Sequence, residues 1–178
     1  MRIRNFRQID IPRLVQLQQL AAEVDGIEAM NAADFAEWLL QLELEAEFNV
    51  FVITDDDDEI NEWGQAGTLE GIEGETVGYT VLQLRQSQHS YHFLCSGAVH
   101  PLYRRQNAGF ALLICALNRV HMLSSEFEFE AELAGHPIYF EALLPLNDVA
   151  SERLARKCEM QPTDERMLEG MRLYRREL

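Results

Sequence analysis

Residues 76–125 contain no aspartate or glutamate, although the chain of 178 residues has 30 acidic side chains and a formal net charge of −15. An even distribution would place about eight acids there. The segment holds three apolar runs instead: TVGYTVLQLRQ at 76–86, SYHFLCSGAV at 90–99 and AGFALLICALNRVHML at 108–123. The first two are typical of buried strands, and the third, apolar nearly all round, indicates a helix buried between a sheet and other elements. The chain must therefore pack a helix onto a sheet.

Strands and helices alternate along the rest of the chain. Further strands are predicted at 2–6, 48–54, 136–144 and 166–176, and helices after Asp10, Asn31 and Asn147. The acidic stretch 55–75 predicts a hairpin loop, and 126–135 receives no assignment. The residues predicted to face the core from the first two helices are Leu14, Leu17, Leu20 and Ala21, then Phe35, Trp38, Leu39, Leu42 and Leu44. This order predicts an α/β (α+β) fold, one domain over 1–178, with helices packed on a mixed sheet.

Charge and composition exclude several classes of function. A net charge of −15 argues against nucleic-acid binding, which depends on Lys and Arg neutralising phosphates. No run of 18 apolar residues and no apolar leader is present, so a cytoplasmic protein without a membrane partner is expected. Cys95, Cys115 and Cys158 form no CxxC pair, which predicts reduced thiols. The acidic run from Asp55 lacks the glycine and glutamate of a calcium loop, and no metal site is predicted.

The turn before the apolar helix combines positive charge with small residues. A strand that leads into a helix N-terminus offers unpaired N–H groups and the positive end of the helix dipole to an anion. Arg104 and Arg105 can add charge-assisted hydrogen bonds, and Asn107 tolerates a left-handed backbone. The loop matches neither the GxxxxGK[ST] nor the GxGxxG phosphate motif. It nevertheless predicts a pyrophosphate site, because small residues would let the phosphate approach the backbone: Ala108, Gly109 and Ala111.

This stretch resembles the acetyl-CoA-binding motif of the GNAT superfamily of N-acetyltransferases, a strand ending in Val-x-Pro followed by [QR]-x-x-G-x-[GA] and a helix. Val99, His100 and Pro101 precede RRQNAG, so Arg104, Asn107 and Gly109 occupy the three signature positions, with Asn107 in place of the usual glycine. A second register, QNAGFA at 106–111, begins two residues later. The resemblance continues in IRNFRQIDIPRLVQLQ, TVGYTVL and NDVASERLARKCEM, where the usual Leu-Gly-Phe is Cys158, Glu159 and Met160.

The resemblance implies a GNAT-like mixed, mostly antiparallel sheet of about six to seven strands, with helices on both faces and the fourth and fifth strands splayed apart. It implies an acetyltransferase that moves an acetyl (acyl) group from acetyl-CoA to a primary amine of a small molecule or peptide, directly in a ternary complex. The alternative is a non-catalytic GNAT-like module that binds acyl-CoA or another protein. The residues implied to hold the co-substrate are Ala98, Val99, Arg104, Arg105, Gln106, Asn107, Ala108, Gly109, Phe110, Ala111 and Asn147.

The residues that would move protons depart from the family pattern. Where some members have a glutamate in the fourth strand, this chain has Phe93, with His92 beside it on the opposite face. Leu154 stands where many members have a tyrosine on the last helix. Three candidates for catalysis remain, each with a structural alternative: His92, Tyr139 and Ser151.

The sequence also suggests two partners, a cationic amine and a second copy of the chain. Asp25 and Glu28 lie between the first two helices, a region that shapes the acceptor pocket in the family, and they would suit a cationic amine. A solvated loop is the alternative for these acids. The closing strand is available to pair with a second copy, which would give a homodimer.

Overall fold

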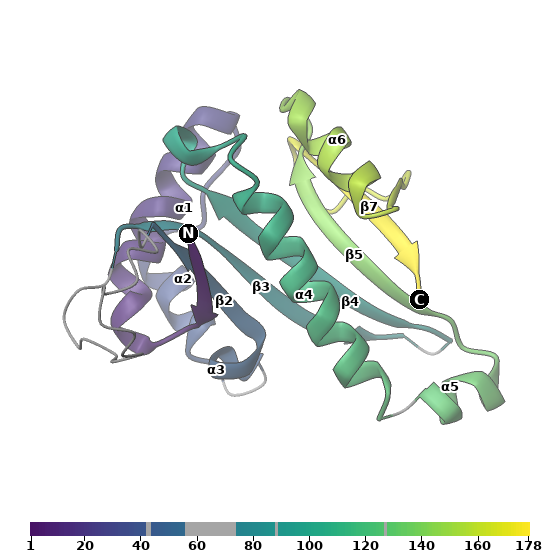
Figure 1. Ribbon diagram of the computed structural model, residues 1–178. Helices are drawn as coiled ribbons and strands as arrows, with labels where there is room; N and C mark the ends of the chain where they lie inside the picture. The colour runs from purple at the N-terminus through teal and green to yellow at the C-terminus, as the bar shows by residue number, and fades with distance from the viewer. Residues whose placement is uncertain (42–43, 56–73, 88, 127) are drawn as a thin grey trace, which may run out of the picture.

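Two long strands, β3 (Thr76–Gln86) and β4 (Tyr91–Val99), form the centre of the sheet in the computed structural model (Figure 1). The structure describes residues 1–41, 44–55, 74–87, 89–126 and 128–178. Within these ranges the sheet has seven strands in the order β1-β2-β3-β4-β5-β7-β6. The other strands are β1 (Arg2–Asn5), β2 (Val50–Thr54), β5 (Ile138–Pro145), β6 (Gln161–Pro162) and β7 (Met171–Glu177). Among the strand pairs of the described residues, only β4–β5 is parallel, which confirms the predicted mixed, mostly antiparallel sheet.

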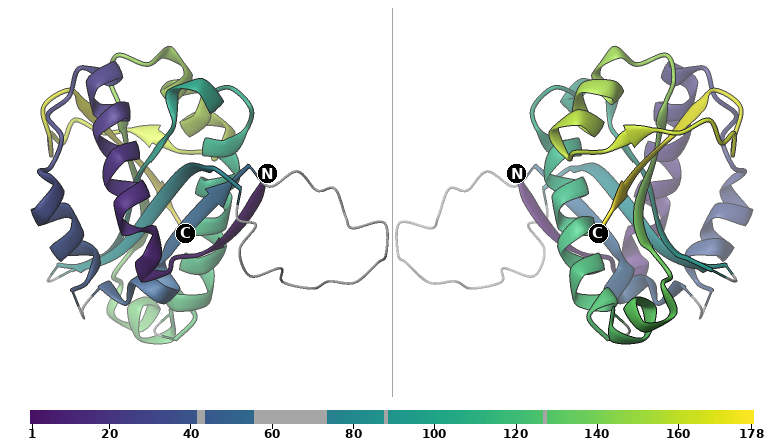
Figure 2. Two further views of the ribbon diagram at one scale, coloured as in Figure 1. Left: turned by 90° about the vertical axis from the view of Figure 1, so that its left-hand side faces the viewer. Right: turned by 90° about the vertical axis from the view of Figure 1, so that its right-hand side faces the viewer.

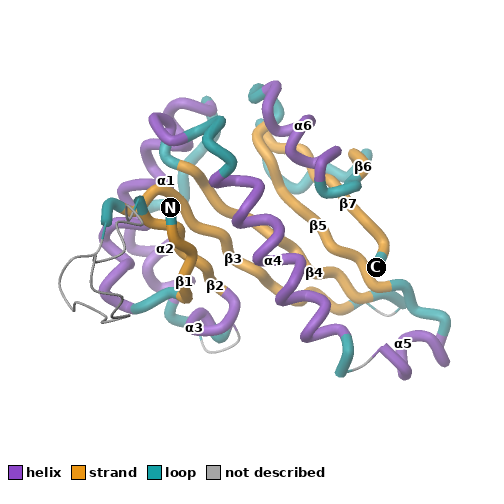
Figure 3. The backbone as a smooth tube through the Cα atoms, in the orientation of Figure 1, coloured by secondary structure: helices purple, strands orange, loops and turns teal. Residues whose placement is uncertain are grey.

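Helices cover both faces of this sheet, as Figures 2 and 3 show. One face carries α1 (Ile11–Asp25) and α2 (Ala32–Leu39), and the opposite face carries α4 (Ala108–Ser124). The remaining helices are α3 (Ala46–Asn49), α5 (Glu128–Ala134) and α6 (Val149–Lys157), with short 3-10 turns η1 (Gln8–Asp10) and η3 (Pro101–Tyr103). In the described part of the chain no single helix could cross a bilayer by length and apolarity, and only α4 and α5 taken together, across a bend of 73°, pass that test.

Strand alternation divides the core into two layers. Val50 and Val52 of β2 pack under α1 and α2, whereas Phe51 and Ile53 of the same strand pack under α4. All five residues of β2 are consequently buried. The apolar helix α4 buries Leu112, Leu113, Ala116, Leu117 and Val120 against the sheet. It was predicted to be buried on all sides, but its other face is open, and Met122 there is 64% exposed.

Several boundaries differ from the sequence predictions. Leu20 is 45% exposed, because α1 rests on the sheet along a narrower stripe of Leu14, Leu17 and Ala21. The second helix ends at Leu39, so Leu44 reaches the core from a separate turn. Phe48 lies in α3 and is exposed, and the strand begins only at Val50.

Two stretches in the last third of the chain also differ from expectation. The unassigned stretch 126–135 contains α5, and the last strand begins at Met171 rather than at 166. The short strand β6, which was not predicted, pairs with part of the outer edge of β7. Leu42 and most of the predicted hairpin loop, 56–73, lie outside the described residues.

A buried ion pair ties β1 to the start of α1. Two nitrogens of Arg4 each donate to a carboxylate oxygen of Asp10 at 2.7 Å, and the Arg7 N–H donates to the same group at 2.8 Å. Burial alone would raise the pKa of Asp10, but these hydrogen bonds and the charges of both arginines outweigh it and hold the pKa below 3.8. Because the folded-state pKa is depressed, the stabilisation is complete above the unfolded value and is lost as pH falls through the folded value.

We therefore expect Asp10→Asn to lower the free energy of unfolding by about 2 kcal/mol at neutral pH, the usual contribution of hydrogen bonds to charged groups. The difference from the unmodified protein should shrink as the pH falls below 3.8. Urea denaturation over a pH series measures both quantities. A difference that stays constant down to about pH 2 would contradict this role for the Asp10 carboxylate.

Candidate cofactor-binding site

The two parallel strands at the centre of the sheet separate before they end. Their pairing runs from Tyr91 opposite Ile138 to Cys95 opposite Ala142 and stops there. β4 continues to Val99 with β3 as its partner, whereas β5 continues to Pro145 with β7. Figure 1 shows the two strands diverging towards the end of the sheet at which α4 begins. The predicted splay between the fourth and fifth strands is confirmed.

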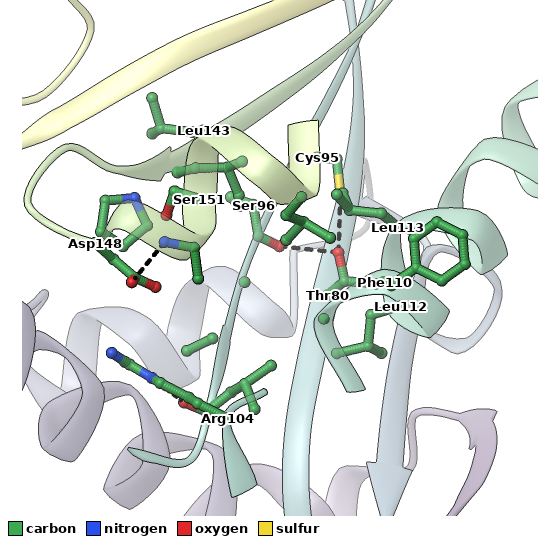
Figure 4. A pocket seen from close by; sticks show the side chains of 18 of the residues that line it. Thr80, Cys95, Ser96, Arg104, Phe110, Leu112, Leu113, Leu143, Asp148 and Ser151 are labelled. Carbon is green, nitrogen blue, oxygen red and sulfur yellow. Dashed lines mark hydrogen bonds between the residues drawn. The ribbon is translucent and has the colours of Figure 1, made fainter. Parts of the chain in front are cut away.

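A cavity of about 230 Å³ occupies this separation. Consecutive residues of β3 and β4, whose side chains alternate between the two faces of the sheet, line this cavity. Figure 4 shows its interior with Ser151 and Leu143 on one side and Thr80 and Leu113 on the other. The strands contribute Tyr79, Thr80, Cys95, Ser96, Gly97, Ala98, Val99, Leu143, Leu144 and Pro145. The remaining lining is Asp25 of α1, Arg104, Arg105, Asn107, Gly109, Phe110, Leu112 and Leu113 around the start of α4, and Asp148, Ala150, Ser151, Leu154 and Lys157 around α6.

The N-terminus of α4 opens into this cavity without a side-chain cap. Asn107 occupies the N-cap position with φ 65°, as predicted, and its side chain makes no capping hydrogen bond. Arg105 also has a positive φ, so the chain turns sharply twice before the helix. A Cβ atom on Gly109 would lie 3.4 Å from Leu154, so the backbone approaches α6 closely here. The first N–H groups of a 17-residue helix are left for an acceptor from outside.

Arg104 has a carboxylate partner that is distant in sequence and close in space. Its Nη1 and Nη2 donate to the two carboxylate oxygens of Asp25 at 2.6 and 2.9 Å, and its Nε donates to the carbonyl of Val99 at 3.2 Å. The guanidinium therefore joins the end of α1 to the end of β4. Arg105 and Lys157 also line the cavity, and neither forms an ion pair with a carboxylate of the described residues.

Eight of the predicted catalytic and co-substrate residues line the cavity: Ala98, Val99, Arg104, Arg105, Asn107, Gly109, Phe110 and Ser151. Four predicted co-substrate residues do not. Gln106 is exposed, whereas Ala108 and Ala111, both in α4, pack towards β2 and β3. Asn147 is exposed, and its neighbour Asp148 both caps α6, by accepting from the Ala150 N–H at 3.0 Å, and lines the cavity.

His92 and Tyr139 lie outside the cavity, in a polar network on the α1 face of the sheet. The carboxylate of Glu141 is 2% exposed and accepts from His92 Nδ1 at 2.9 Å and from Arg175 Nε at 2.7 Å. His92 Nε2 contacts the hydroxyl of Ser90 at 2.8 Å, and Arg175 lies over the ring of Tyr139. This geometry indicates that both residues support the sheet. The expected alternation in β4 is confirmed, since Phe93 is buried on the α4 side.

The acids expected near an amine acceptor separate in the structure. Asp25 lines the cavity, but its carboxylate is already held by Arg104. Glu28 is exposed and is not part of the cavity lining.

Among the lining residues that were not predicted from the sequence are Tyr79, Thr80, Ser96 and Lys157. Tyr79, Thr80 and Ser96 have the sequence pattern of ordinary core or surface positions of a strand. The register of β3 against β4 is what brings them to the cavity. All three cysteines are free, as predicted. Burial raises the pKa of Cys95 to about 12, and its Sγ lies 2.9 Å from the hydroxyl of Thr80. Cys95 is therefore a protonated thiol at neutral pH and a poor nucleophile.

The fold and site together define a mixed α/β protein with a cavity between two parted parallel strands, beside an uncapped helix N-terminus. No protein-family model and none of the curated proteins matches the sequence. Among solved structures, a GCN5-related N-acetyltransferase from Sphaerobacter thermophilus is 16% identical with a TM-score of 0.65, over 90% of this chain and 43% of that one. This chain thus spans less than half of that protein.

Two further solved structures match over nearly their whole length. The putative acetyltransferase yncA from Salmonella typhimurium, described with its cofactor acetyl-CoA, is 14% identical over 99% of this chain and 92% of that one, with a TM-score of 0.57. A NatC complex described as bound to Gag peptide and CoA is 11% identical over 98% and 94%, with a TM-score of 0.61. At these identities the likeness concerns the fold, and the chain has the GNAT fold.

Proposed function

We propose that this protein is an acyl-CoA-dependent N-acyltransferase that transfers an acetyl group from acetyl-CoA to a primary amine of a small molecule or peptide. The observation that carries the proposal is the cavity between the parted strands, into which the uncapped N-terminus of α4 opens. An elongated ligand with a phosphate group at one end suits this shape, because the phosphate can accept from the helix N–H groups. The GNAT fold shared with acetyl-CoA-bound yncA supports the same assignment.

The residues present fit such a ligand. Arg105 and Lys157 would neutralise phosphate charge, while Arg104, held by Asp25, would fix the loop rather than bind the ligand. β5 does not pair with β4 beyond Cys95, so the edge of β4 near Ala98 and Val99 that faces β5 would hydrogen-bond an amide-containing arm, although the Val99 carbonyl already accepts from Arg104 Nε. When bound, acetyl-CoA supplies a thioester-activated acyl group. The high pKa of the Cys95 thiol favours direct transfer to the amine over a covalent cysteine intermediate.

The alternative is a non-catalytic GNAT-like module that binds acyl-CoA. It is favoured by the carboxylates of the cavity, since Asp25 is paired with Arg104 and Asp148 caps α6, which leaves no free carboxylate base in the described lining. Both functions require the same cofactor site. They differ only in whether an amine consumes the bound acyl group.

The test is thermal unfolding with acetyl-CoA and with desulfo-CoA at low and high salt. A ligand at about a hundred times its dissociation constant adds roughly 2.7 kcal/mol, which raises Tm by about 5–10 °C for a chain of this size. The rise should shrink in high salt, because the phosphate contacts are electrostatic. Turnover is then measured as CoA release with a polyamine, a lysine peptide and a peptide with a free N-terminus.

The outcomes separate the candidate functions. A salt-sensitive shift with CoA release identifies the enzyme, and a shift without release for any amine identifies the binding module. No shift at millimolar acetyl-CoA would withdraw both proposals.

A further inference from the structure

A second cavity, of about 300 Å³, lies between α1 and the start of β3. It is called the Thr76 cavity below, and the polar residues that line it are Arg13 and Gln16 of α1, Glu75, Thr76 and His100. It shares no described lining residue with the cavity between β4 and β5. A volume of this size is at the lower end of the range for ligand sites, so it suits a small molecule.

Thr76 brings a buried hydroxyl to this cavity. The residue is 6% exposed, and its Oγ1 has no hydrogen-bond partner among the described residues. The strand register shifts next to it, and the bulge turns both Val77 and Gly78 towards Leu112 of α4. By alternation, the Thr76 side chain that precedes them faces α1 and the cavity.

An unpaired buried hydroxyl indicates a partner from outside the chain. A buried polar group without a hydrogen bond destabilises the folded state, whereas valine would fill the same space as Thr76 without that penalty. The cavity that Thr76 lines is where a ligand could supply the missing partner.

The other polar groups of the cavity carry opposite charges. Arg13 is exposed and forms no ion pair or hydrogen bond with a described residue. The Glu75 carboxylate accepts from the Tyr103 hydroxyl through Oε2 at 3.0 Å, which leaves its other oxygen for a ligand. His100 Nδ1 accepts from a backbone N–H at 3.3 Å, so a neutral ring carries its proton on Nε2 and can donate it. A ligand that satisfies these groups carries both a carboxylate and an ammonium.

The remaining wall of the cavity is apolar. Leu17 and Leu20 line it from α1, and Leu20 is 45% exposed although the sequence predicts it in the core. An aliphatic side chain on the ligand would cover Leu20 and remove its apolar surface from water. A carboxylate, an ammonium and an aliphatic side chain together describe a free α-amino acid.

We propose that the Thr76 cavity binds a free aliphatic α-amino acid. The Thr76 hydroxyl and Arg13 donate to its carboxylate, and Glu75 accepts from its ammonium. Hydrogen bonds between charged groups and the fit of both charges give the specificity. The inference does not rest on the proposed function, because the two cavities have no described lining residue in common.

The experiment is calorimetry of the full chain without acetyl-CoA, with three probes. Leucine carries both charges, N-acetylleucine keeps only the carboxylate, and leucinamide keeps only the ammonium. We expect leucine to bind at least about tenfold more tightly than either of the other two, because each of them lacks a charge-assisted hydrogen bond. Equal affinity for leucine and N-acetylleucine would overturn the proposal in favour of a simple anion site, and no binding of leucine at millimolar concentration would overturn it outright.

Thr76→Val separates a ligand-binding hydroxyl from a structural one. The variant should bind leucine about tenfold more weakly, while Tm of the unliganded protein stays the same or rises. Thr80→Val is the matched control for stability, since it removes a buried hydroxyl that donates to the Ser96 carbonyl at 3.2 Å and should lower Tm. If Thr76→Val lowered Tm and kept the affinity for leucine, the role of Thr76 in binding would be overturned.

Two arginine variants locate the ligand. Arg13→Gln should lower the affinity for leucine at least about tenfold, and Arg105→Gln, in the other cavity, should leave it unchanged. The reverse pattern would place leucine between β4 and β5 and overturn the proposal. Each of these results is independent of the thermal shift with acetyl-CoA, which tests the proposed function by itself.

Discussion

Replacing Glu141 with alanine should lower the free energy of unfolding by about 3 kcal/mol or more, because it leaves a partly buried arginine without its main counter-ion. The Glu141 carboxylate is 2% exposed and accepts from both His92 and Arg175. Arg175 Nη2 also contacts Glu165 at 2.8 Å, but Glu165 is exposed and compensates little. Urea denaturation with a constant m-value measures the loss.

A paired substitution separates the charge from the packing. Glu141→Leu with Arg175→Met removes both ions and keeps a similar volume, so it should recover most of the stability that Glu141→Ala loses. His92→Ala should cost less, because Glu141 keeps its arginine partner. A loss below about 1 kcal/mol in Glu141→Ala would mean that the interactions of Glu141 with His92 and Arg175 stabilise the fold no more than an exposed ion pair does. If His92→Ala abolished turnover without changing stability, the catalytic role predicted for His92 from the sequence would replace the structural one.

The apolar pattern was sufficient to predict the architecture. The strands at 76–86 and 90–99 and the helix from Ala108 agree with β3, β4 and α4 to within one residue at each end. The central parts of these elements are buried, and burial is what the hydrophobic pattern reports. The errors fall where the pattern is weak, as at Phe48, where an exposed aromatic residue in a short helix reads like the start of a strand.

The candidate site was only partly predictable, because its residues meet through tertiary contacts. The loop from Arg104 to Gly109 is continuous in sequence, and its motif indicated an anion site. The pairing of Arg104 with Asp25 joins residues from two distant segments, so no local signal could reveal it. Tyr79 was missed for a related reason, since a tyrosine among valines in a strand has the sequence pattern of a core residue whatever its hydroxyl faces.

Introducing a negative charge at the start of α4 should abolish acyl-CoA binding while leaving the fold intact. Gly109 lines the cavity in the first turn of the helix, and a Cβ there would make an ordinary contact with Val99 at 3.8 Å and a tighter one with Leu154 at 3.4 Å. The Gly109→Glu carboxylate would occupy the helix N–H groups and repel a phosphate. Since like charges placed together cost several kcal/mol, we expect acetyl-CoA affinity to fall about 100-fold or more.

The same substitution should affect stability in the opposite direction. A carboxylate in the first turn of a helix is favourable by about 0.3–1 kcal/mol, and replacing a helical glycine removes a further entropic cost. Tm of the unliganded protein should therefore stay the same or rise, while the shift caused by acetyl-CoA disappears. Gly109→Gln is the matched control, because it adds the same bulk without charge and should lose much less affinity. If Gly109→Glu instead lowered Tm and left the acetyl-CoA shift in place, the loop would be a structural turn rather than a phosphate site.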